Sequence, residues 1–430
     1  MHAEILVVGG GVMGTSIAMH TAQRTDRLGK PVVLFERGEL GCGSSGRSGA
    51  ILRQYHGNSV VARMARDSLR DYSTFEARTG RAIGFRRTGV LIFSGPSSPE
   101  SCQRLRENVE MLKGLGIETD LVEKKELAEL VPGIEVKPGT IGAWEPEGGF
   151  VDPIRTVNAF AALARTAGAV TRLGVEVQEI LVEGGKVVGA NTSEGRYSAK
   201  KICIVAGPWS ARLLKPLGIE LPVRTIGSES HFVVMRDSDL LDEEPEDESY
   251  VLREALSFDD IQDPVERVAG SSARASLGLH PVLIDLEQGF YLRCEPRQRR
   301  TRLGKTDYDC DKVLSDADQL EEQVSQEFID WSRRALIKLM PTYANEADAG
   351  SQTTWQTMTP DFQGLIGPVG EIEGLYVMTG FSGHGFKLAP VIGAGVAQML
   401  MDERITTFEA ESFSPSRFSG GEDWSGRFVF

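Results

Sequence analysis

Short apolar runs that end in small residues recur at three places along the chain. Ile5–Val8 precedes the glycines of residues 9–14, and comparable runs lie at 201–205 and 375–378. A short, continuous apolar run is typical of a central parallel strand that is buried on both faces. Because the three runs are spread over the whole chain, they predict one nucleotide-binding domain assembled from separate segments, with a second domain inserted in two pieces.

Between these runs, the spacing of apolar and polar residues predicts further helices and strands. Helices are expected at 15–25, 60–79, 97–115, 156–167 and from 389 onward. Strands are expected at 84–93, 175–180 and 186–192, the last two joined by a Gly184-Gly185 turn. The pattern is that of an α/β fold (α+β overall).

The expected domain boundaries follow from the breaks in this pattern at proline and glycine. A Rossmann-type βαβ domain is expected to comprise residues 1–84, 150–222 and 345–430. An inserted antiparallel-sheet substrate domain is expected to comprise residues 85–149 and 223–344.

The first glycine turn fits the pattern G-x-G-x-x-G with Gly9, Gly11 and Gly14. A second apolar run at 31–35 ends in Glu36, 22 residues past Gly14, where a carboxylate typically holds a ribose 2′-hydroxyl. A solvated acid at a strand end is the alternative interpretation of Glu36. The order of strand, glycines, helix, strand and acid predicts a dinucleotide site, and the motif alone does not distinguish FAD from NAD.

The stretch from Gly41 to Tyr55 is rich in glycine, serine and arginine. Small hydroxyl residues and an arginine directly after the ribose acid suit a second contact with a pyrophosphate. A flexible surface linker is the alternative, but a linker rarely contains apolar residues such as Ile51 and Leu52.

The stretch at 379–388 carries three glycines in six residues and one lysine, Lys387. Glycines let backbone approach a flat or anionic group closely, and the N-terminus of the following helix adds partial positive charge. Lys387 is either a phosphate ligand or a reactive-site cation. Since the N-terminal motif already supplies a pyrophosphate site, the second role is favoured.

Composition limits the classes of partner. The chain has 430 residues and a net charge of −14, which argues against nucleic acid or an anionic membrane surface. Five cysteines lie scattered without metal-ligand spacing and predict reduced thiols, so no metal is expected. No signal peptide and no run of about 18 apolar residues is visible, which predicts a soluble, cytoplasmic protein without a membrane span.

Two charged segments stand apart from these motifs. Residues 236–268 carry 13 acidic and 3 basic side chains, typical of a solvated loop, with an active-site lid or partner surface as alternatives. A basic cluster at 297–305 is typical of an exposed strand edge and predicts a structural role.

With these motifs in place, the chain resembles the D-amino-acid-oxidase superfamily of flavoproteins, and within it sarcosine oxidases and dimethylglycine dehydrogenases. The resemblance rests on residues 9–14 with Glu36, on 206–210, and on a closing segment that contains 358–361, 366–368 and 380–387. It implies an FAD cofactor. The residues expected to bind FAD are Gly9, Gly11, Val12, Met13, Gly14, Glu36, Arg37, Ser44, Ser45, Gly46, Arg47, Ser48, Val177, Ala206, Gly207, Trp209, Gly383, His384, Gly385, Phe386 and Lys387.

The resemblance also assigns catalytic roles. Lys387 matches a lysine that lies by flavin N5 in sarcosine oxidases and promotes reaction with oxygen, although a lysine that extends to solvent is the alternative. Arg53 matches an arginine that holds the substrate carboxylate, with a surface or phosphate-contacting arginine as the alternative. His384 is expected to be either catalytic or structural.

Two departures from the family pattern concern covalent attachment of the flavin. Thr354 stands where monomeric sarcosine oxidase has its flavin-linked cysteine, and residues 44–53 lack the histidine that anchors flavin in dimethylglycine dehydrogenases. Non-covalent FAD is therefore expected.

The resemblance implies oxidation of a small, carboxylate-bearing amine, such as an N-methyl or secondary amino acid, by hydride transfer to flavin N5 and hydrolysis of the imine. Oxygen or an electron-transfer acceptor would accept the electrons. Two alternatives stay open: oxidation of a 2-hydroxy acid or a polyol phosphate, and a non-catalytic flavoprotein that acts as an assembly factor or as the β-subunit of a hetero-oligomer.

Overall fold

The computed structural model describes residues 2–25, 31–235, 279–306 and 313–418. The acidic segment at 236–268, predicted to be a solvated loop, lies outside the described residues.

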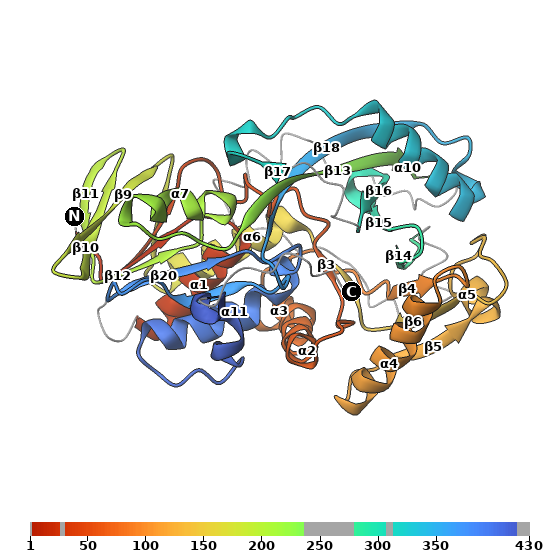
Figure 1. Cartoon of the computed structure of the whole chain (residues 1–430), viewed down its shortest axis with the longest axis horizontal. Helices are drawn as coiled ribbons and strands as arrows, with labels where there is room; N and C mark the ends of the chain where they lie inside the picture. The colour runs from red at the N-terminus through yellow and green to blue at the C-terminus, as the bar shows by residue number, and fades with distance from the viewer. Residues whose placement is uncertain (1, 26–30, 236–278, 307–312, 419–430) are drawn as a thin grey trace.

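A six-stranded sheet is built from the three apolar runs that the sequence singles out. Its strands, in spatial order, are β19 (Leu365–Pro368), β20 (Leu375–Thr379), β12 (Lys201–Ile204), β1 (Ile5–Val8), β2 (Val32–Glu36) and β8 (Val170–Leu173). All described pairings in it are parallel except that of β19 with β20. Strands that lie far apart in the sequence are therefore neighbours in one mostly parallel sheet, as the three apolar runs predict (Figure 1).

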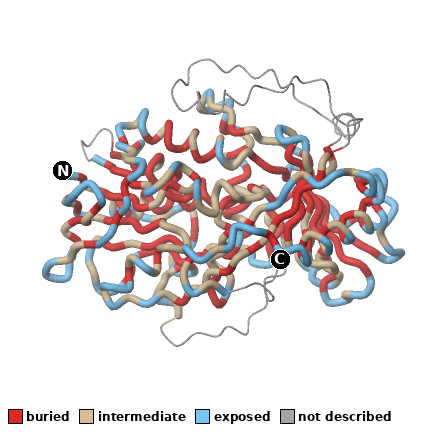
Figure 2. Tube along the Cα trace, turned by 90° about the horizontal axis from the view of Figure 1, so that it is seen from above, coloured by how far each residue is buried: buried red, intermediate tan, exposed pale blue. Residues whose placement is uncertain are grey.

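Both faces of this sheet are covered, as the continuous apolar runs predict. Ile5 and Val7 of β1 belong to a core shared with the helices, whereas Leu6 and Val8 belong to a core shared with a small antiparallel sheet. The covering helices are α1 (Val12–Thr25), α6 (Pro153–Thr166) and α11 (Gly385–Leu400), and the small sheet consists of β9 (Val177–Glu183), β10 (Lys186–Thr192) and β11 (Gly195–Ser198). Figure 2 shows buried residues running through the interior of the molecule and exposed residues at its periphery.

A second, nine-stranded sheet forms the other part of the molecule. Its strands are β17 (Val313–Leu314), β13 (Arg224–Val234), β16 (Arg300–Lys305), β15 (Phe290–Glu295), β14 (Val282–Asp285), β4 (Val90–Ser94), β6 (Ile141–Glu145) and β5 (Asp120–Glu123), with β18 (Asp348–Met358) paired to β13. Its described pairings are antiparallel except that β4 and β14 run parallel. The predicted fold class is confirmed. The domain boundaries themselves remain a prediction, and β18, which falls in the expected 345–430 segment, pairs within this second sheet.

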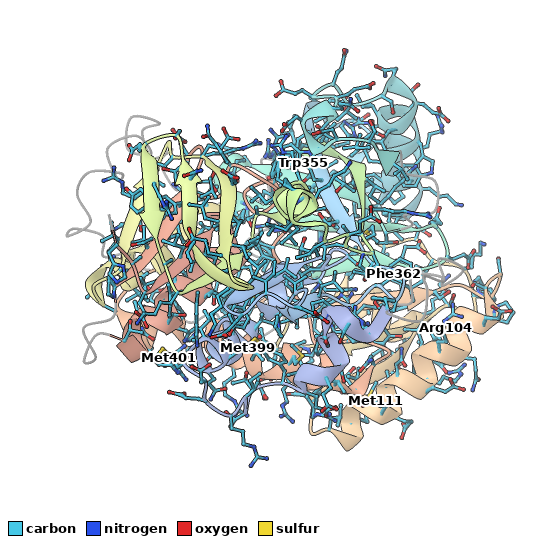
Figure 3. All side chains as sticks on the ribbon, turned by 60° about the vertical axis from the view of Figure 1, so that its left-hand side comes forward. Arg104, Met111, Trp355, Phe362, Met399 and Met401 are labelled. Carbon is cyan, nitrogen blue, oxygen red and sulfur yellow. The ribbon has the colours of Figure 1, made fainter. Side chains whose placement is uncertain are left out.

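The remaining elements complete the two layers. The other helices are α2 (Ser59–Ser73), α3 (Phe75–Thr79), α4 (Pro99–Gly114), α5 (Lys124–Leu130), α7 (Ser210–Leu214) and α10 (Gln326–Leu339), and β3 (Ile51–Leu52) pairs with β7 (Gly149–Phe150). Short 3-10 turns include η2 (Gly207–Trp209), η3 (Lys215–Leu217), η5 (Pro296–Gln298), η6 (Ala317–Gln319), η7 (Pro341–Tyr343), η8 (Ala410–Phe413) and η9 (Pro415–Phe418). Figure 3 labels Met399 near the end of α11, which covers the six-stranded sheet, and Trp355 on β18, which belongs to the nine-stranded sheet.

Three local expectations are corrected. The helix predicted over 60–79 is interrupted at Thr74, because the hydroxyl groups of Ser73 and Thr74 both bond to the carbonyl of Arg70 and end α2 there. The last helix begins at Gly385 rather than near residue 389, so Lys387 lies in its first turn. The basic cluster does not lie on a strand edge, because β16 lies between β13 and β15.

That basic cluster is instead partly buried around one carboxylate. Glu295 accepts hydrogen bonds from Arg302 at 2.7 Å and Arg300 at 2.8 Å, and it forms an ion pair with Arg293 at 3.3 Å. Burial opposes ionisation of Glu295, but the surrounding guanidinium groups lower its pKa below the usual value. These contacts agree with the structural role predicted for the cluster.

Candidate active site

The glycines of the first turn are required by close approach of backbone atoms. Gly9 has a φ of +120°, and a Cβ added to it would lie 2.5 Å from the carbonyl oxygen of Val205. A Cβ on Gly14 would lie 1.9 Å from the carbonyl oxygen of Gly9. Both contacts are shorter than any side chain tolerates, so the turn fits the role predicted for a strand-to-helix glycine motif.

The carboxylate of Glu36 lies against this turn. It accepts a hydrogen bond from the backbone N–H of Gly10 at 2.7 Å and one from Gly38 at 2.9 Å. A carboxylate has about four lone-pair sites, so Glu36 keeps capacity for a further donor such as a hydroxyl. The solvated end of a strand is therefore not its environment, since it is held at the glycine turn.

The segment predicted to make a second pass over the nucleotide folds across the start of α1. The Ser45 hydroxyl accepts a hydrogen bond from the N–H of Val12 at 3.0 Å. A Cβ on Gly46 would lie 2.5 Å from the carbonyl oxygen of Gly41, so Gly46 serves the tight fold of the segment. A flexible linker is ruled out by these contacts.

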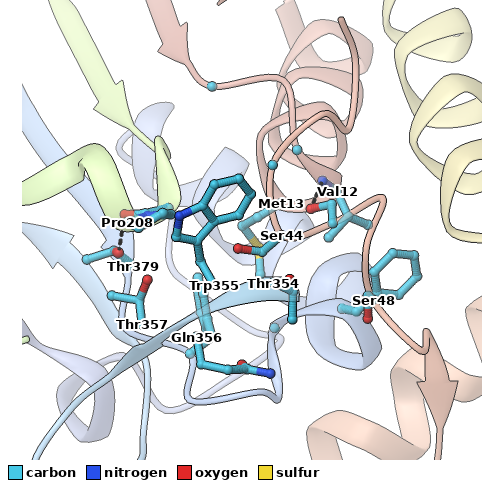
Figure 4. A pocket seen from close by; sticks show the side chains of 18 of the residues that line it. Val12, Met13, Ser44, Ser48, Pro208, Thr354, Trp355, Gln356, Thr357 and Thr379 are labelled. Carbon is cyan, nitrogen blue, oxygen red and sulfur yellow. Dashed lines mark hydrogen bonds between the residues drawn. The ribbon is translucent and has the colours of Figure 1, made fainter. Parts of the chain in front are cut away.

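One cavity of about 640 Å³ brings the predicted site residues together. Figure 4 shows residues from the start of α1, from the serine-rich segment and from β18 gathered around it. Of the predicted residues, those that line it are Gly9, Gly11, Val12, Met13, Glu36, Arg37, Ser44, Ser45, Arg47, Ser48, Arg53, Val177, Ala206, Gly207, Trp209, Gly383, His384, Gly385, Phe386 and Lys387. Gly14 and Gly46 do not line it and act through packing.

Lys387 and His384 form a buried pair at the start of α11. The Lys387 Nζ lies 3.4 Å from Nδ1 of His384 and 3.5 Å from the carbonyl oxygen of Gly383. Lys387 is only 6% exposed, so a lysine that extends to solvent is excluded. Burial first, and then the charge of Arg53, lower the pKa of Lys387 well below its usual value. Burial and the charges of Lys387 and Arg53 lower the pKa of His384 in the same way.

Arg53 directly follows β3 and is 3% exposed, so it is no surface arginine. Its guanidinium donates to the carbonyl oxygen of Tyr55 and lines the same cavity as Lys387. The charge of Arg53 contributes to the lowered pKa of Lys387, and two basic side chains that line one buried site favour an anion there. The cavity is lined by six lysines and arginines (Arg37, Arg47, Arg53, Arg212, Lys305 and Lys387) but by two acids (Glu36 and Glu176), counted over the described residues.

Two buried ionisable residues near Arg53, His56 and Glu145, were not predicted from the sequence. His56 is buried with its ring centroid 5.0 Å from that of His384 in an edge-to-face arrangement. Glu145, at the end of β6, is fully buried, and its carboxylate accepts a hydrogen bond from the N–H of Gln54 at 3.0 Å. The contact joins residues 91 positions apart, and no local pattern marks it.

Of another wall of the cavity, the sequence had singled out Thr354 for the position of the flavin-linked cysteine but had not predicted the wall itself. It comes from the second sheet, whose lining residues include Ser228, Ser230, Ile284, Tyr291, Lys305, Thr354, Trp355, Gln356 and Thr357. These positions are scattered over five strands, and none of them has a residue type that is unusual in a strand. Alternation on a strand predicts which residues share a face, but not what that face covers.

The cavity fits a large, partly anionic cofactor. The N-terminus of α1 opens into it through Gly11, Val12 and Met13, which suits a pyrophosphate. The buried hydroxyl of Thr354 has no hydrogen-bond partner within the described part of the chain, although it lines the cavity. A buried hydroxyl in this state calls for a polar partner in the cavity.

Comparison with known proteins decides the family. A family model described as FAD dependent oxidoreductase matches residues 4–399. The chain belongs to this family. It is therefore an FAD-dependent oxidoreductase, and the resemblance to the D-amino-acid-oxidase superfamily is confirmed.

Individual relatives share only a low sequence identity with this chain. The oxidoreductase is 26% identical over 421 residues to peroxisomal sarcosine oxidase from Homo sapiens, with 96% of each chain covered. It is 24% identical over 429 residues to 4-methylaminobutanoate oxidase (formaldehyde-forming) from Paenarthrobacter nicotinovorans, covering 98% of this chain and 46% of that protein. It thus spans about half the length of the second relative.

Solved structures show the same fold. The L-proline dehydrogenase from P. horikoshii superposes with a TM-score of 0.80 at 23% identity, over 98% of this chain and 99% of that one. Within the described residues, no helix is long and apolar enough to cross a membrane.

Proposed function

We propose that this oxidoreductase oxidises a small amine that carries a carboxylate, such as an N-methyl or secondary amino acid. The observation that carries the proposal is that two buried basic side chains, Arg53 and Lys387, line one cavity that otherwise suits FAD. Relatives named for sarcosine and for 4-methylaminobutanoate, both amines with a carboxylate, support this substrate class.

The cofactor would be held by the first turn and by the C-terminal glycine stretch. Glu36 would bind a ribose hydroxyl, the N–H groups at the start of α1 and Ser45 would face the pyrophosphate, and residues 383–387 would face the ring. When bound, FAD supplies the hydride acceptor for oxidation at the carbon next to nitrogen.

We further propose that FAD is bound without a covalent link. Thr354 is the residue at the position of the flavin-linked cysteine in monomeric sarcosine oxidase, and a hydroxyl does not form that thioether. Its buried Oγ1 lines the cavity and would instead hydrogen-bond to the cofactor.

The chain's own contribution is to bind and orient the substrate. The planar guanidinium of Arg53 would hold the carboxylate through two charge-assisted hydrogen bonds, with its orientation fixed by the Tyr55 carbonyl. Lys387 would add a second positive charge. Because burial lowers the pKa of Lys387, an anion bound next to Nζ would favour its protonated form.

Location and partners are part of the same proposal. The dispersed cysteines and acidic composition support a cytoplasmic protein, and oxygen or an electron-transfer acceptor would reoxidise it. A partner subunit would be revealed by co-purification at a fixed stoichiometry.

A substrate panel tests the proposal. The oxidised holoenzyme is mixed under anaerobic conditions with sarcosine, proline, N-methylated 4-aminobutanoate and the 2-hydroxy acids of matching size, and the visible absorbance of the flavin is followed. Bleaching by at least one amino acid and by none of the hydroxy acids is expected. Bleaching by the hydroxy acids alone, or by no compound of the panel, would overturn the proposal.

A further inference from the structure

A carboxylate from the second part of the molecule binds three residues of the first. Asp318 lies in η6, and its Oδ1 accepts a hydrogen bond from the indole Nε1 of Trp209 at 2.7 Å. Its Oδ2 accepts one from Arg212 at 2.7 Å, and Arg37 lies 3.3 Å from its Oδ1. The donors lie between 106 and 281 positions away in the sequence, so this cluster, called the Asp318 cluster below, is a tertiary contact between segments.

The three donors all line the cavity, whereas Asp318 does not. They continue into a stacked wall. The Arg37 guanidinium carbon lies 4.1 Å from the centroid of the Trp209 ring, which packs edge-on against Trp355 at 5.1 Å. Arg47 in turn lies over Trp355 at 4.7 Å, so two cations and two indoles form one continuous wall of the cavity.

The same turn of chain fixes both indoles. While Asp318 accepts from Trp209, the carbonyl oxygen of its neighbour Ala317 accepts from Nε1 of Trp355 at 2.7 Å. Trp209 belongs to η2 and Trp355 to β18, so η6 joins the two layers of the protein across the wall. Loss of the Asp318 carboxylate would remove one hydrogen-bond acceptor from Trp209, Arg37 and Arg212 at once, while Arg212 would keep its ion pair with Asp316 at 3.8 Å.

The charges in the cluster stabilise its contacts. Hydrogen bonds from Arg212, Trp209 and Arg37 lower the pKa of Asp318 to about 2, so it is ionised at neutral pH. Its side chain is 47% exposed, and single exposed ion pairs contribute little. Three donors on one carboxylate form a network, which is held more firmly than an isolated pair.

We propose that the Asp318 cluster holds together the cavity wall next to Glu36 and thereby slows the release of bound FAD. This inference rests on the FAD site proposed above. Arg37 follows Glu36 directly in the chain, so this wall borders the residue expected to hold the cofactor's ribose. Asp318 is thus a positioning residue that acts through Arg37, Trp209 and Arg212.

The experiment compares the Asp318→Asn holoenzyme with the wild type. Each is diluted, and the rise of free-FAD fluorescence is followed to give the rate of FAD dissociation. The Asn variant keeps the shape but loses the charge, and roughly three- to tenfold faster release is expected. Added salt should speed release from the wild type more than from the variant, because salt screens the cluster.

The matched control is Glu322→Gln, which removes one exposed charge four residues away, and its release rate should equal that of the wild type. Arg212→Gln should reproduce the Asp318→Asn effect, and the double variant should add little to either single change. Thermal unfolding of the apoproteins should differ by about 2 °C or less, which separates the effect from a general loss of stability.

Two outcomes would overturn the inference in distinguishable ways. Normal FAD binding by all proteins, with equal release rates for Asp318→Asn and Glu322→Gln, would contradict the role of the cluster alone. Failure of the wild type to bind FAD at all would overturn the proposed function on which that role rests.

Discussion

The Nζ of Lys387 lies 3.4 Å from the Nδ1 of His384, and both side chains are buried at the start of α11. Burial and the charge of Arg53 lower the pKa of each group, so the pair is held in surroundings that disfavour positive charge. An anion bound in the cavity would relieve this cost. The relationship explains how a site with buried cations would select a carboxylate-bearing substrate.

Replacement of Lys387 by Met removes one of these cations while it keeps most of the side-chain volume. The dissociation constant for an amino-acid substrate, measured by anaerobic reduction of the flavin, should rise about tenfold or more, because charged hydrogen bonds contribute about 1.5–3 kcal/mol. Lys125→Met is the control, since Lys125 is 86% exposed and far from any described site residue in the sequence. An unchanged dissociation constant would contradict the proposed role.

The same variant tests the second role predicted for Lys387, which is to promote reaction with oxygen. The reduced enzyme is mixed with oxygen, and recovery of the flavin absorbance is timed. Slower recovery in Lys387→Met than in Lys125→Met is expected for an oxidase. Equal rates would show that Lys387 has no part in reoxidation and would favour an acceptor other than oxygen.

Glu145 predicts how stability depends on pH. Burial raises the pKa of Glu145 to about 7 from an ordinary 4.5, despite hydrogen bonds and the charge of Arg53, which act in the opposite direction. A raised pKa stabilises the folded state below the unfolded pKa, and this stability is lost as pH rises through about 7. The free energy of unfolding of the wild type should therefore fall, relative to Glu145→Gln, by about 3 kcal/mol between these pH values.

Chemical denaturation at a series of pH values measures this difference. The glutamine variant keeps the acceptor for the Gln54 N–H and does not titrate, so it serves as the matched reference. Parallel pH profiles for the two proteins would show that Glu145 ionises normally in the folded state.

If FAD is bound without a covalent link, denaturation of the protein should release the yellow flavin. Precipitation with acid should leave all of the flavin in the supernatant, because Thr354 offers no thiol for a bond to the ring. The absorbance of the supernatant and the fluorescence of the washed pellet are measured. A fluorescent pellet would contradict the assignment.

Sequence patterns predicted the parts of the fold that are set by residues close together in the chain. The run Ile5–Val8 is apolar at every position because both faces of β1 are covered, and Gly9 and Gly14 are required by backbone contacts within the turn itself. The glycine stretch before α11 was also recognisable. The cavity includes 20 of the 22 residues that the sequence singled out, and their individual roles remain predictions.

The parts that escaped prediction depend on contacts between distant segments. Glu145 and Gln54 lie 91 positions apart, and Asp318 meets Arg37 across 281 positions, so no local pattern marks either contact. The break between α2 and α3 has a local cause, the hydrogen bond from the Thr74 hydroxyl to the carbonyl of Arg70. The sequence alone does not show which carbonyl this hydroxyl bonds to. A wall drawn from five strands is visible only once the strands are placed beside the first sheet.

The most direct test of the proposed function is a comparison of substrates with and without a carboxylate on two forms of the enzyme. Wild type and Arg53→Met are reduced anaerobically by an accepted N-methyl amino acid and by its carboxamide, and the four dissociation constants are compared. We expect the wild type to bind the acid roughly 10- to 100-fold more tightly than the amide, and we expect Arg53→Met to abolish this preference. Equal preference in both enzymes would contradict the claim that Arg53 holds the substrate carboxylate.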